Sequence, residues 1–400
     1  MALTNTATRY GTVTKTLHWI IALGIVAAIP LGILANDAPL ETSEELATKA
    51  WLFSMHKTLG VTIFFAALLR ILWALTQPKP APLHPERKAE SWAAETVHWL
   101  LYGSLVLVPL TGWMHHSATT GFAPIWWPFG QSLPFVPKDE GWAEVTAALH
   151  IVFERVLIVS LLLHVAGALK HHFVDRDATL RRMWFGRTTA GDPNAGHRKA
   201  VPLASALVVW AAAIGIGAGL GVFQHEASAA QVAALEEVES DWQVQDGTLS
   251  ITVTQMGSEV TGSFSDWTAD ITFEEQDAPG KSGEVSVTVS IGSLTLGSVT
   301  SQAMGADFFN VEQFPTATFD ADILKVEDGY EAQGTLTVKD QSVPVTLPFQ
   351  LRLDGDTAEM AGRLTLDRRD FNVGQNMSDG SQLGFDVGVD VALTATRATD

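Results

Sequence analysis

One long apolar stretch limits what this chain can fold into more than any other feature. It comprises residues 143–173, AEVTAALHIVFERVLIVSLLLHVAGALKHHF, and it exceeds the roughly 20 residues that a helix needs to cross a bilayer. His150 and His164 lie inside it, 14 residues apart. Four helical turns take about 14 residues, so both imidazoles leave the same face, about 21 Å apart along the axis. An ionisable side chain at membrane depth indicates function. Two on one stripe therefore predict two stacked ligand positions.

Four other apolar stretches predict further membrane helices. They are Thr16–Leu34, Trp51–Thr76, Trp92–Met114 and Val201–Phe223. The first could also be a secretory signal peptide, but its apolar run is long and no convincing cleavage site follows, which favours an uncleaved helix. The last carries no ionisable residue and is typical of an anchor. Residues 121–137, rich in Pro and aromatic side chains, are expected at the membrane interface over the bundle.

The distribution of Lys and Arg predicts the orientation in the membrane. One set of loops and helix ends carries 13 of them: Arg9, Lys15, Arg70, Lys79, Arg87, Lys88, Lys170, Arg176, Arg181, Arg182, Arg187, Arg198 and Lys199. The opposite side carries only Lys49, Lys57, Lys138 and Arg155. Because basic residues stay on the cytoplasmic side, the N-terminus is expected there. The fifth helix would then deliver the second half of the chain to the periplasm.

The second half has a different character. Residues 1–223 have a net charge of +3 and residues 224–400 a net charge of −22. Beyond an expected linker at 224–240, apolar and polar residues alternate with a period of two, separated by Gly, Asp and Asn. This pattern predicts an all-β antiparallel barrel or sandwich, with one helical turn near Ser298–Met304. The chain has no cysteine, which excludes disulfides, covalently attached haem, iron–sulfur clusters and thiol chemistry.

Depth in the membrane pairs four of the histidines. His56 and His150 are expected near the outer surface, and His18 and His164 near the cytoplasmic one. Two imidazoles from facing helices can fill both axial positions of a haem iron, which suits electron transfer rather than oxygen activation. The alternative is a set of histidines that hydrogen-bond between helices. Four histidines at two matched depths favour haem ligation.

Further residues are candidates for contacts with a cofactor or substrate. His98 lies at the depth of the inner pair, where it competes as an iron ligand or contacts a quinone or a propionate. His115 and His116 end the third helix at the outer interface, where a quinone or propionate contact is expected. Arg155 lies about one turn beyond His150 and needs a partner, either Glu154 or a haem propionate.

Motifs in four helices resemble one membrane family. They are RYGTVTKTLHWI, MHKTLGVTIFFAALLRILW, VHWLLYGSLVLVPLTGWM and LLLHVAGALKHHFVDRDATLRRM. In this order, over about residues 8–185, they are similar to the bacterial cytochrome b561 family. The resemblance implies a four-helix bundle that binds two b haems through four histidines, matching His18, His56, His150 and His164. It also implies oxidation or reduction of membrane quinone.

The second half resembles the YceI-like family from Trp242 to Arg397. The similarity rests on GADFFNVEQFPTATF (305–319), GTLTVKDQSVPVTLPFQL (334–351) and LTLDRRDFNVG (364–374). It implies a lipocalin-like periplasmic barrel that holds a polyisoprenoid chain in an apolar lumen. Family members often carry histidines near the first strands, whereas Gln255 stands at such a position here. This departure puts recognition of a ligand head group in question and leaves the apolar lumen unaffected.

Together these patterns predict a multidomain protein of a bacterial inner membrane. The expected parts are a four-helix dihaem domain (1–187), a loop and fifth helix (188–223), the linker (224–240) and the barrel (241–400). The expected function is electron transfer between the quinone pool and a periplasmic partner, or superoxide, while the barrel binds a polyisoprenoid or a prenylated quinone such as ubiquinone. Two alternatives stay open: a quinone carrier with a haem sensor or anchor, and the cytochrome subunit of a larger dehydrogenase. No nucleic-acid partner is expected.

Overall fold

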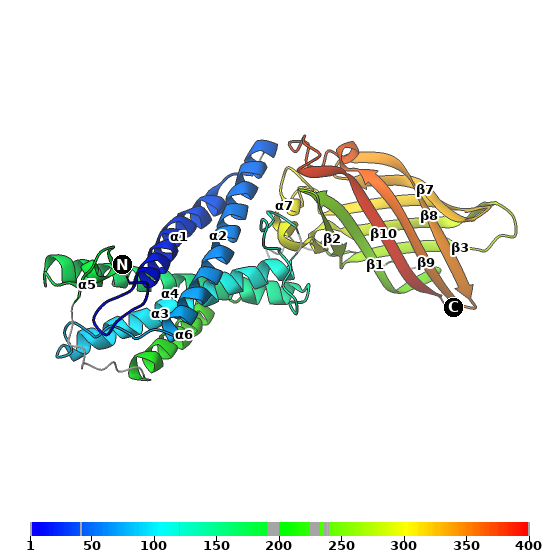
Figure 1. The fold of residues 1–400 in the computed structure, drawn as a ribbon. Helices are drawn as coiled ribbons and strands as arrows, with labels where there is room; N and C mark the ends of the chain where they lie inside the picture. The colour runs from blue at the N-terminus through cyan, green and yellow to red at the C-terminus, as the bar shows by residue number, and fades with distance from the viewer. Residues whose placement is uncertain are drawn as a thin grey trace. The chain divides into compact units, whose positions relative to one another are not determined.

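The structure is a computed structural model that describes residues 2–40, 42–119, 121–189, 200–224, 233–235, 238 and 240–398. Two basic residues used to predict the orientation, Arg198 and Lys199, lie outside the described residues. So does most of the predicted linker 224–240. The chain divides into two compact units. The first comprises Met1–Asp37, Trp51–Thr119 and Pro124–His225, and the second Ala38–Ala50, Thr120–Ala123 and Glu226–Asp400. The helices belong mainly to the first unit and all strands to the second (Figure 1).

Five helices in the described part of the chain are long and apolar enough to cross a membrane. They are α1 (Thr12–Asp37), α2 (Ser43–Leu75), α3 (Lys88–Ala118), α4 (Glu140–Phe173) and α6 (Ala200–Gly219). This confirms the predicted apolar helices. Their outward faces carry apolar side chains such as Leu23, Leu72 and Leu162, each more than 60% exposed. That exposure suits hydrocarbon as the surrounding medium and would be costly in water.

The first four apolar helices run beyond the stretches predicted from hydropathy, because their polar ends remain helical. α4 begins at Glu140, for example, where the Asp139 side chain accepts a hydrogen bond from the Trp142 backbone N–H at 2.8 Å. That is the geometry of a helix N-cap. α6 instead ends before the predicted Phe223, and Gly221 behind it has a φ of 78°. Glycine adopts this left-handed conformation readily, and it ends helices.

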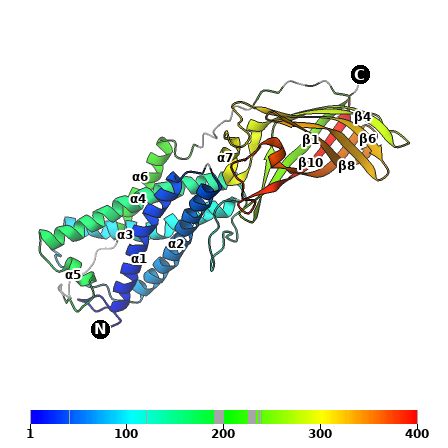
Figure 2. The ribbon, with the colours of Figure 1, turned by 90° about the horizontal axis from the view of Figure 1, so that it is seen from above.

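The helices pack around a shared apolar core. α1 contributes Ile21 and Ile25, and α4 contributes Phe153 and Leu157; side chains of α2 and α3 complete the cluster. The fifth span, α6, packs against α3 and α4 through Ala206 and Trp210. A Cβ at Gly103 of α3 would lie 2.0 Å from the Trp210 ring, so only glycine admits that indole. α6 is therefore packed into the helical unit (Figures 1 and 2).

The second unit is one antiparallel sheet of ten strands that curls around an apolar interior (Figure 2). The strand order is β3-β4-β6-β7-β8-β9-β10-β1-β2-β5, and the short helix α7 (Thr300–Met304) confirms the predicted turn. The strands are β1 (Trp242–Gln255), β2 (Ser258–Phe264), β3 (Trp267–Phe273), β4 (Gly280–Ser290), β5 (Leu294–Thr295), β6 (Thr316–Val326), β7 (Gly329–Val338), β8 (Gln341–Asp354), β9 (Thr357–Asp367) and β10 (Leu383–Arg397). The prediction of an antiparallel β domain is confirmed.

Side chains, rather than a backbone ladder, join β1 to β3 where the curled sheet meets itself. The Trp242 indole N–H donates to the Phe273 carbonyl at 3.1 Å. The Ser240 hydroxyl, just before β1, accepts from the Ile271 N–H at 2.7 Å and lies 3.2 Å from its carbonyl. These bonds satisfy backbone groups of the edge strand β3, which would otherwise be open to pairing with another chain.

Candidate functional sites

The predicted outer pair is brought together by α2 and α4. The ring centroids of His56 and His150 lie 6.5 Å apart with an interplanar angle of 86°. Nδ1 of His56 lies 2.9 Å from the Ala28 carbonyl oxygen, and Nδ1 of His150 lies 2.8 Å from the Val108 carbonyl oxygen. A carbonyl only accepts, so each Nδ1 carries the proton and each Nε2 keeps a free lone pair. That tautomer is the one that binds a metal through Nε2.

Two glycines on neighbouring helices make room for these rings. A Cβ at Gly32 of α1 would lie 2.8 Å from Cε1 of His56. A Cβ at Gly112 of α3 would lie 2.9 Å from Nδ1 of His150. Both distances are shorter than any ordinary carbon contact, so an alanine at either position would force its histidine to move. The position of each imidazole is thus set by a glycine on one side and a carbonyl on the other.

The predicted inner pair joins α1 and α4. The ring centroids of His18 and His164 lie 6.1 Å apart, with an interplanar angle of 66°. Nδ1 of His18 is buried and has no hydrogen-bond partner among the described residues. His98 also contacts His164, at 5.1 Å between centroids, while its own Nδ1 lies 2.6 Å from the Ala94 carbonyl of the preceding turn. The structure therefore brings three histidines together at this depth.

These separations test whether a metal ion fits between the rings. A metal–imidazole bond of about 2.1 Å on each side, plus about 1.1 Å from each nitrogen to its ring centre, separates the centroids by roughly 6.4 Å. The pairs His56–His150 at 6.5 Å and His18–His164 at 6.1 Å both come close to this value. The 5.1 Å between His98 and His164 falls short by more than 1 Å. By this measure the two pairs matched by depth leave room for a metal ion between their rings, and the pair that includes His98 does not.

The remaining candidates, His115, His116 and Arg155, contact other residues of the helical unit. The rings of His115 and His116 contact each other at 4.6 Å, and Nδ1 of His115 lies 2.8 Å from the Ala143 carbonyl of α4. Arg155 pairs with Glu154 at 3.3 Å, and its side chain is 73% exposed. Of the two partners predicted for Arg155, the structure contains Glu154. Contacts of these three residues with a quinone or a propionate remain predictions.

The aromatic segment after α3 lies against α2 and α3. The Trp126 backbone N–H donates to the Thr58 hydroxyl at 3.0 Å, and the Trp113 indole donates to the Gly130 carbonyl at 2.9 Å. The rings of Phe65 and Phe129 stack at 5.4 Å. Thr58 lies two residues after His56, so this segment contacts the turn of α2 that carries His56.

The burial of two lysines is a structural feature that the sequence reasoning missed. Lys15 is 2% exposed, and its ammonium donates to the carbonyls of Trp184 at 2.8 Å and Gly186 at 3.0 Å. The Trp19 indole donates to the Met183 carbonyl at 2.9 Å. These bonds fix the segment after α5 (Thr179–Met183) against the end of α1 that carries His18. Lys57, next to His56, is 7% exposed, and its ammonium lies 6.0 Å from the Phe53 ring centre.

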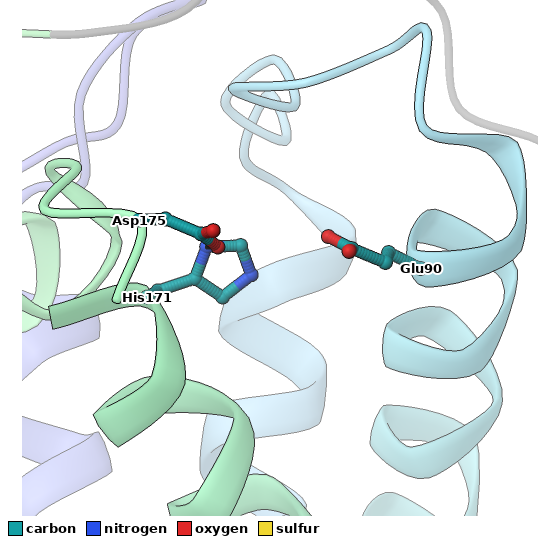
Figure 3. Close-up of side chains that lie close together, drawn as sticks. All are labelled: Glu90, His171 and Asp175. Carbon is teal, nitrogen blue, oxygen red and sulfur yellow. Dashed lines mark ion pairs between the residues drawn. The ribbon is translucent and has the colours of Figure 1, made fainter. Parts of the chain in front are cut away.

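A charged network joins the ends of α3 and α4. Figure 3 shows Glu90, His171 and Asp175, whose ligand atoms lie close enough to surround a metal ion. The Lys170 ammonium, however, lies 2.8 Å from Glu90 and 2.9 Å from Asp175. Arg87 lies 3.3 Å from Asp175. The side-chain cations supply the positive charge that these carboxylates need, which indicates a structural ion-pair network rather than a metal site.

Asp177 links this network to the loop after α2. Its carboxylate lies 2.6 Å from Nδ1 of His171 and 3.1 Å from Nε2 of His84, and it accepts from the Thr179 N–H at 2.8 Å. Burial opposes ionisation of Asp177, but the hydrogen bonds from Thr179 and His171 outweigh it and lower the pKa of Asp177 to about 2. Sequence reasoning assigned no role to His84. His84 and Asp177 are 93 positions apart, so the local sequence pattern could not predict their contact.

The interior of the curled sheet holds an apolar cavity of about 210 Å³. Its lining includes Trp242, Trp267, Phe319, Leu336 and Met360, and no charged side chain is among the residues that surround it. Its volume exceeds the roughly 150 Å³ of an engineered cavity that binds benzene. Gln255 is buried but does not line this cavity. The cavity therefore offers an apolar ligand contact area without fixed polar groups.

Comparison with known proteins identifies both parts. The family model of the prokaryotic cytochrome b561 matches residues 9–186. Cytochrome b561 homolog 2 of Escherichia coli (strain K12) is 30% identical over 184 residues, which are 46% of this chain and 95% of that protein. This chain is a member of the prokaryotic cytochrome b561 family. The probable superoxide oxidase CybB of Yersinia pestis is 25% identical over 168 residues, which are 42% of this chain and 90% of that protein.

The second part of this cytochrome b561 family member matches the YceI-like domain model over residues 241–395. The structural comparison matches the crystal structure of Burkholderia cenocepacia BcnA, with 29% sequence identity and a TM-score of 0.35. The match covers 38% of this chain and 96% of the BcnA chain. The chain thus joins a cytochrome b561 membrane domain to a YceI-like domain, as the sequence motifs predicted. The family implies haem b in the helical unit.

Proposed function

We propose that the helical unit is a dihaem cytochrome b that transfers electrons through two stacked haems. His56 and His150 would hold the outer haem, and His18 and His164 the inner one. The observation that carries this assignment is the separation of the two ring pairs, 6.5 Å and 6.1 Å, which matches axial ligation of an iron. Held by these four histidines, haem b would supply one-electron transfer.

The surrounding residues have supporting roles in this proposal. The carbonyls of Ala28 and Val108 accept the Nδ1 protons of the outer pair, so both Nε2 atoms would be free to hold the haem iron. The segment fixed by Lys15 and Trp19 lies beside His18, where it would limit access of water to the inner pair. Both effects keep the ligand geometry constant during electron transfer, which lowers its reorganisation cost.

Quinone and a periplasmic electron-transfer partner are the proposed substrates. The excess of Lys and Arg on one side supports a cytoplasmic N-terminus in a bacterial inner membrane. His115, His116 and the aromatic segment at residues 121–137 offer rings that can stack on a quinone and relay its protons. At the other end, His98 is the candidate for that role. One relative is named a probable superoxide oxidase, which supports superoxide as an alternative electron donor.

For the YceI-like domain we propose binding of a polyisoprenoid or the tail of a prenylated quinone. The support is the cavity, which presents only apolar side chains to a ligand. Burial of each methylene contributes about 0.8 kcal/mol, so a chain of several isoprene units gains affinity without any polar contact. The domain would then present, store or remove the same class of molecule that the helical unit oxidises or reduces.

Haem counting in single variants tests the ligand assignment. His18→Ala, His56→Ala, His150→Ala and His164→Ala are each expected to lower the ratio of haem to protein from about two to about one, because an iron with a single axial imidazole is weakly held. His98→Ala is the matched control and keeps both haems. Loss of a haem in His98→Ala together with two haems in His18→Ala would contradict the inner pair.

Quinol-dependent haem reduction tests the substrate. A His115→Ala/His116→Ala double variant is expected to slow reduction by ubiquinol if the site lies at the outer end, and His98→Ala if it lies at the inner end. Stopped-flow absorbance of the reduced haem band measures the rate. Rates equal to the wild-type rate in both variants would refute quinone binding at these residues.

A further inference from the structure

Arg182, at the C-terminal end of α5, is a buried cation that the proposed function does not use. It is 6% exposed. One nitrogen of its guanidinium, Nη1, donates to the Ala81 carbonyl at 2.9 Å. The other two nitrogens, Nε and Nη2, are buried and have no hydrogen-bond partner among the described residues. A buried guanidinium that uses one of its three nitrogens is exceptional, because unpaired buried charges are strongly unfavourable.

The surroundings of Arg182 do not neutralise it. The guanidinium lies 5.5 Å from the centre of the Tyr10 ring, a cation–π contact that carries no full charge. Asp177 precedes it in the chain, but its carboxylate is bonded to His171, His84 and Thr179. Burial accordingly lowers the pKa of Arg182, and the fields of Tyr10 and Asp177 offset this only in part. The charge needs a further anionic partner.

The two unpartnered nitrogens lie on one edge of the guanidinium. Nε–H and Nη2–H point in parallel, so together they bind two oxygens of one carboxylate or phosphate group in a bidentate manner. The unused edge therefore has the geometry of an oxyanion site.

We propose that Arg182 binds two oxygens of a carboxylate or phosphate group through its Nε and Nη2 edge. Two sources can supply that group at this end of the bundle. One is a propionate of the inner haem, a source that rests on the proposed function. The other is the phosphate of an anionic membrane lipid. Met183 and Trp184, the next two residues, contact Trp19 and Lys15 beside His18, so Arg182 belongs to the segment that covers the inner pair.

Charge variants of the full-length protein in nanodiscs test this site. Arg182→Gln removes the charge, and Arg182→Lys keeps it but loses the bidentate edge. Arg181→Gln is the matched control, because Arg181 is exposed and next in sequence. One arm measures the midpoint potentials of the haems by spectroelectrochemistry. The second measures phosphatidylglycerol retained by the purified protein, using native mass spectrometry.

Each result has a distinct meaning. A propionate source predicts a lower potential of one haem in Arg182→Gln, a smaller shift in Arg182→Lys and none in Arg181→Gln. A lipid source predicts unchanged potentials, loss of bound phosphatidylglycerol in Arg182→Gln, weaker retention in Arg182→Lys and full retention in Arg181→Gln. If Arg182→Gln and Arg181→Gln are indistinguishable in both arms, Arg182 binds no oxyanion and the inference is wrong. If Arg182→Gln does not assemble, Arg182→Lys decides by the same criteria. A wild-type protein with fewer than two haems would instead refute the proposed function, and the lipid arm would still test Arg182.

Discussion

Gly112→Ala tests the geometry of the outer histidine pair with one added methyl group. The new Cβ would lie 2.9 Å from Nδ1 of His150, whereas ordinary contact begins at 3.4 Å. The ring must therefore move by about 0.5 Å, more than twice the ±0.2 Å within which metal–ligand distances are normally held. His150 cannot move freely, because its Nδ1 bond to Val108 ties it to the same helix that carries Gly112. We expect the outer haem to be lost and the inner haem to be kept.

The assay is the pyridine haemochrome ratio of haem to protein, combined with low-temperature EPR of the ferric protein. Gly112→Ala should lower the ratio from about two towards one and remove one of the two low-spin signals. Gly60→Ala on α2 is the matched control, because a Cβ there meets nothing within 4 Å. Two haems and unshifted EPR signals in Gly112→Ala would show that His150 is not an iron ligand in this geometry.

Three further predictions concern the lumen, the sheet and the charged network. Met360→Lys places a charge in the cavity and should abolish retention of a polyisoprenoid, which mass spectrometry detects. Glu359→Lys, on the exposed side of β9, should retain it. Equal retention in the two variants would refute binding in the cavity. Arg368 is 4% exposed and donates to five backbone carbonyls. Arg368→Met should therefore lower the free energy of unfolding of the β domain by about 3–5 kcal/mol and its melting temperature by roughly 10 °C or more. A fall in melting temperature no larger than that of the exposed Arg369→Met would contradict this. The pKa of Asp177 is lowered to about 2 in the folded protein. Its carboxylate therefore stabilises the fold above the pKa of the unfolded chain, and this stabilisation is lost as the pH falls through about 2. Wild type and Asp177→Asn should differ in melting temperature at neutral pH and converge near pH 2, and a difference that stays constant with pH would refute this role of Asp177.

Hydropathy was sufficient to predict the helices because a bilayer imposes a minimum apolar length on every span. It could not place their ends, since polar termini such as Ser43–Ala50 of α2 stay helical beyond the apolar stretch. The spacing of 14 residues placed His150 and His164 on one helix face, and the expected depths matched them with His56 and His18, whose rings lie beside them in the structure. The contacts that orient the rings could not, because the Ala28 and Val108 carbonyls carry no side-chain signal.

Burial of charged side chains was the main feature that sequence pattern could not reveal. Lys15, Lys57 and Arg182 entered the prediction only as charges that set orientation. A long basic side chain at a helix end can extend to water or turn inward to bind carbonyls, and both choices have the same sequence. Lys15 turns inward because the carbonyls of Trp184 and Gly186, some 170 positions away, lie within reach of its ammonium.

Alternation predicted the strands, but two local features needed the structure. β2 ends at Phe264 and β3 begins at Trp267, where the chain changes partners from β1 to β4. Pro344 and Pro348 lie inside β8, although proline disfavours central strands. β8 pairs with β9 only from Phe349 onward, so both prolines lie where one side of the strand has no ladder to join.

The two units achieve selectivity by opposite means. In the helical unit the carbonyls of Ala28 and Val108 accept the Nδ1 protons of His56 and His150. Only Nε2 of each ring is then free to bind, and a metal ion between the rings would bind both Nε2 atoms. In the sheet the cavity presents no donor or acceptor to fix a head group, so affinity must grow with the apolar area that a ligand buries. A head group would then remain outside the cavity, free for chemistry elsewhere. The proposed prenylated quinone has both properties, an apolar chain for the cavity and a redox ring for the helical unit, so one class of molecule would serve both proposals.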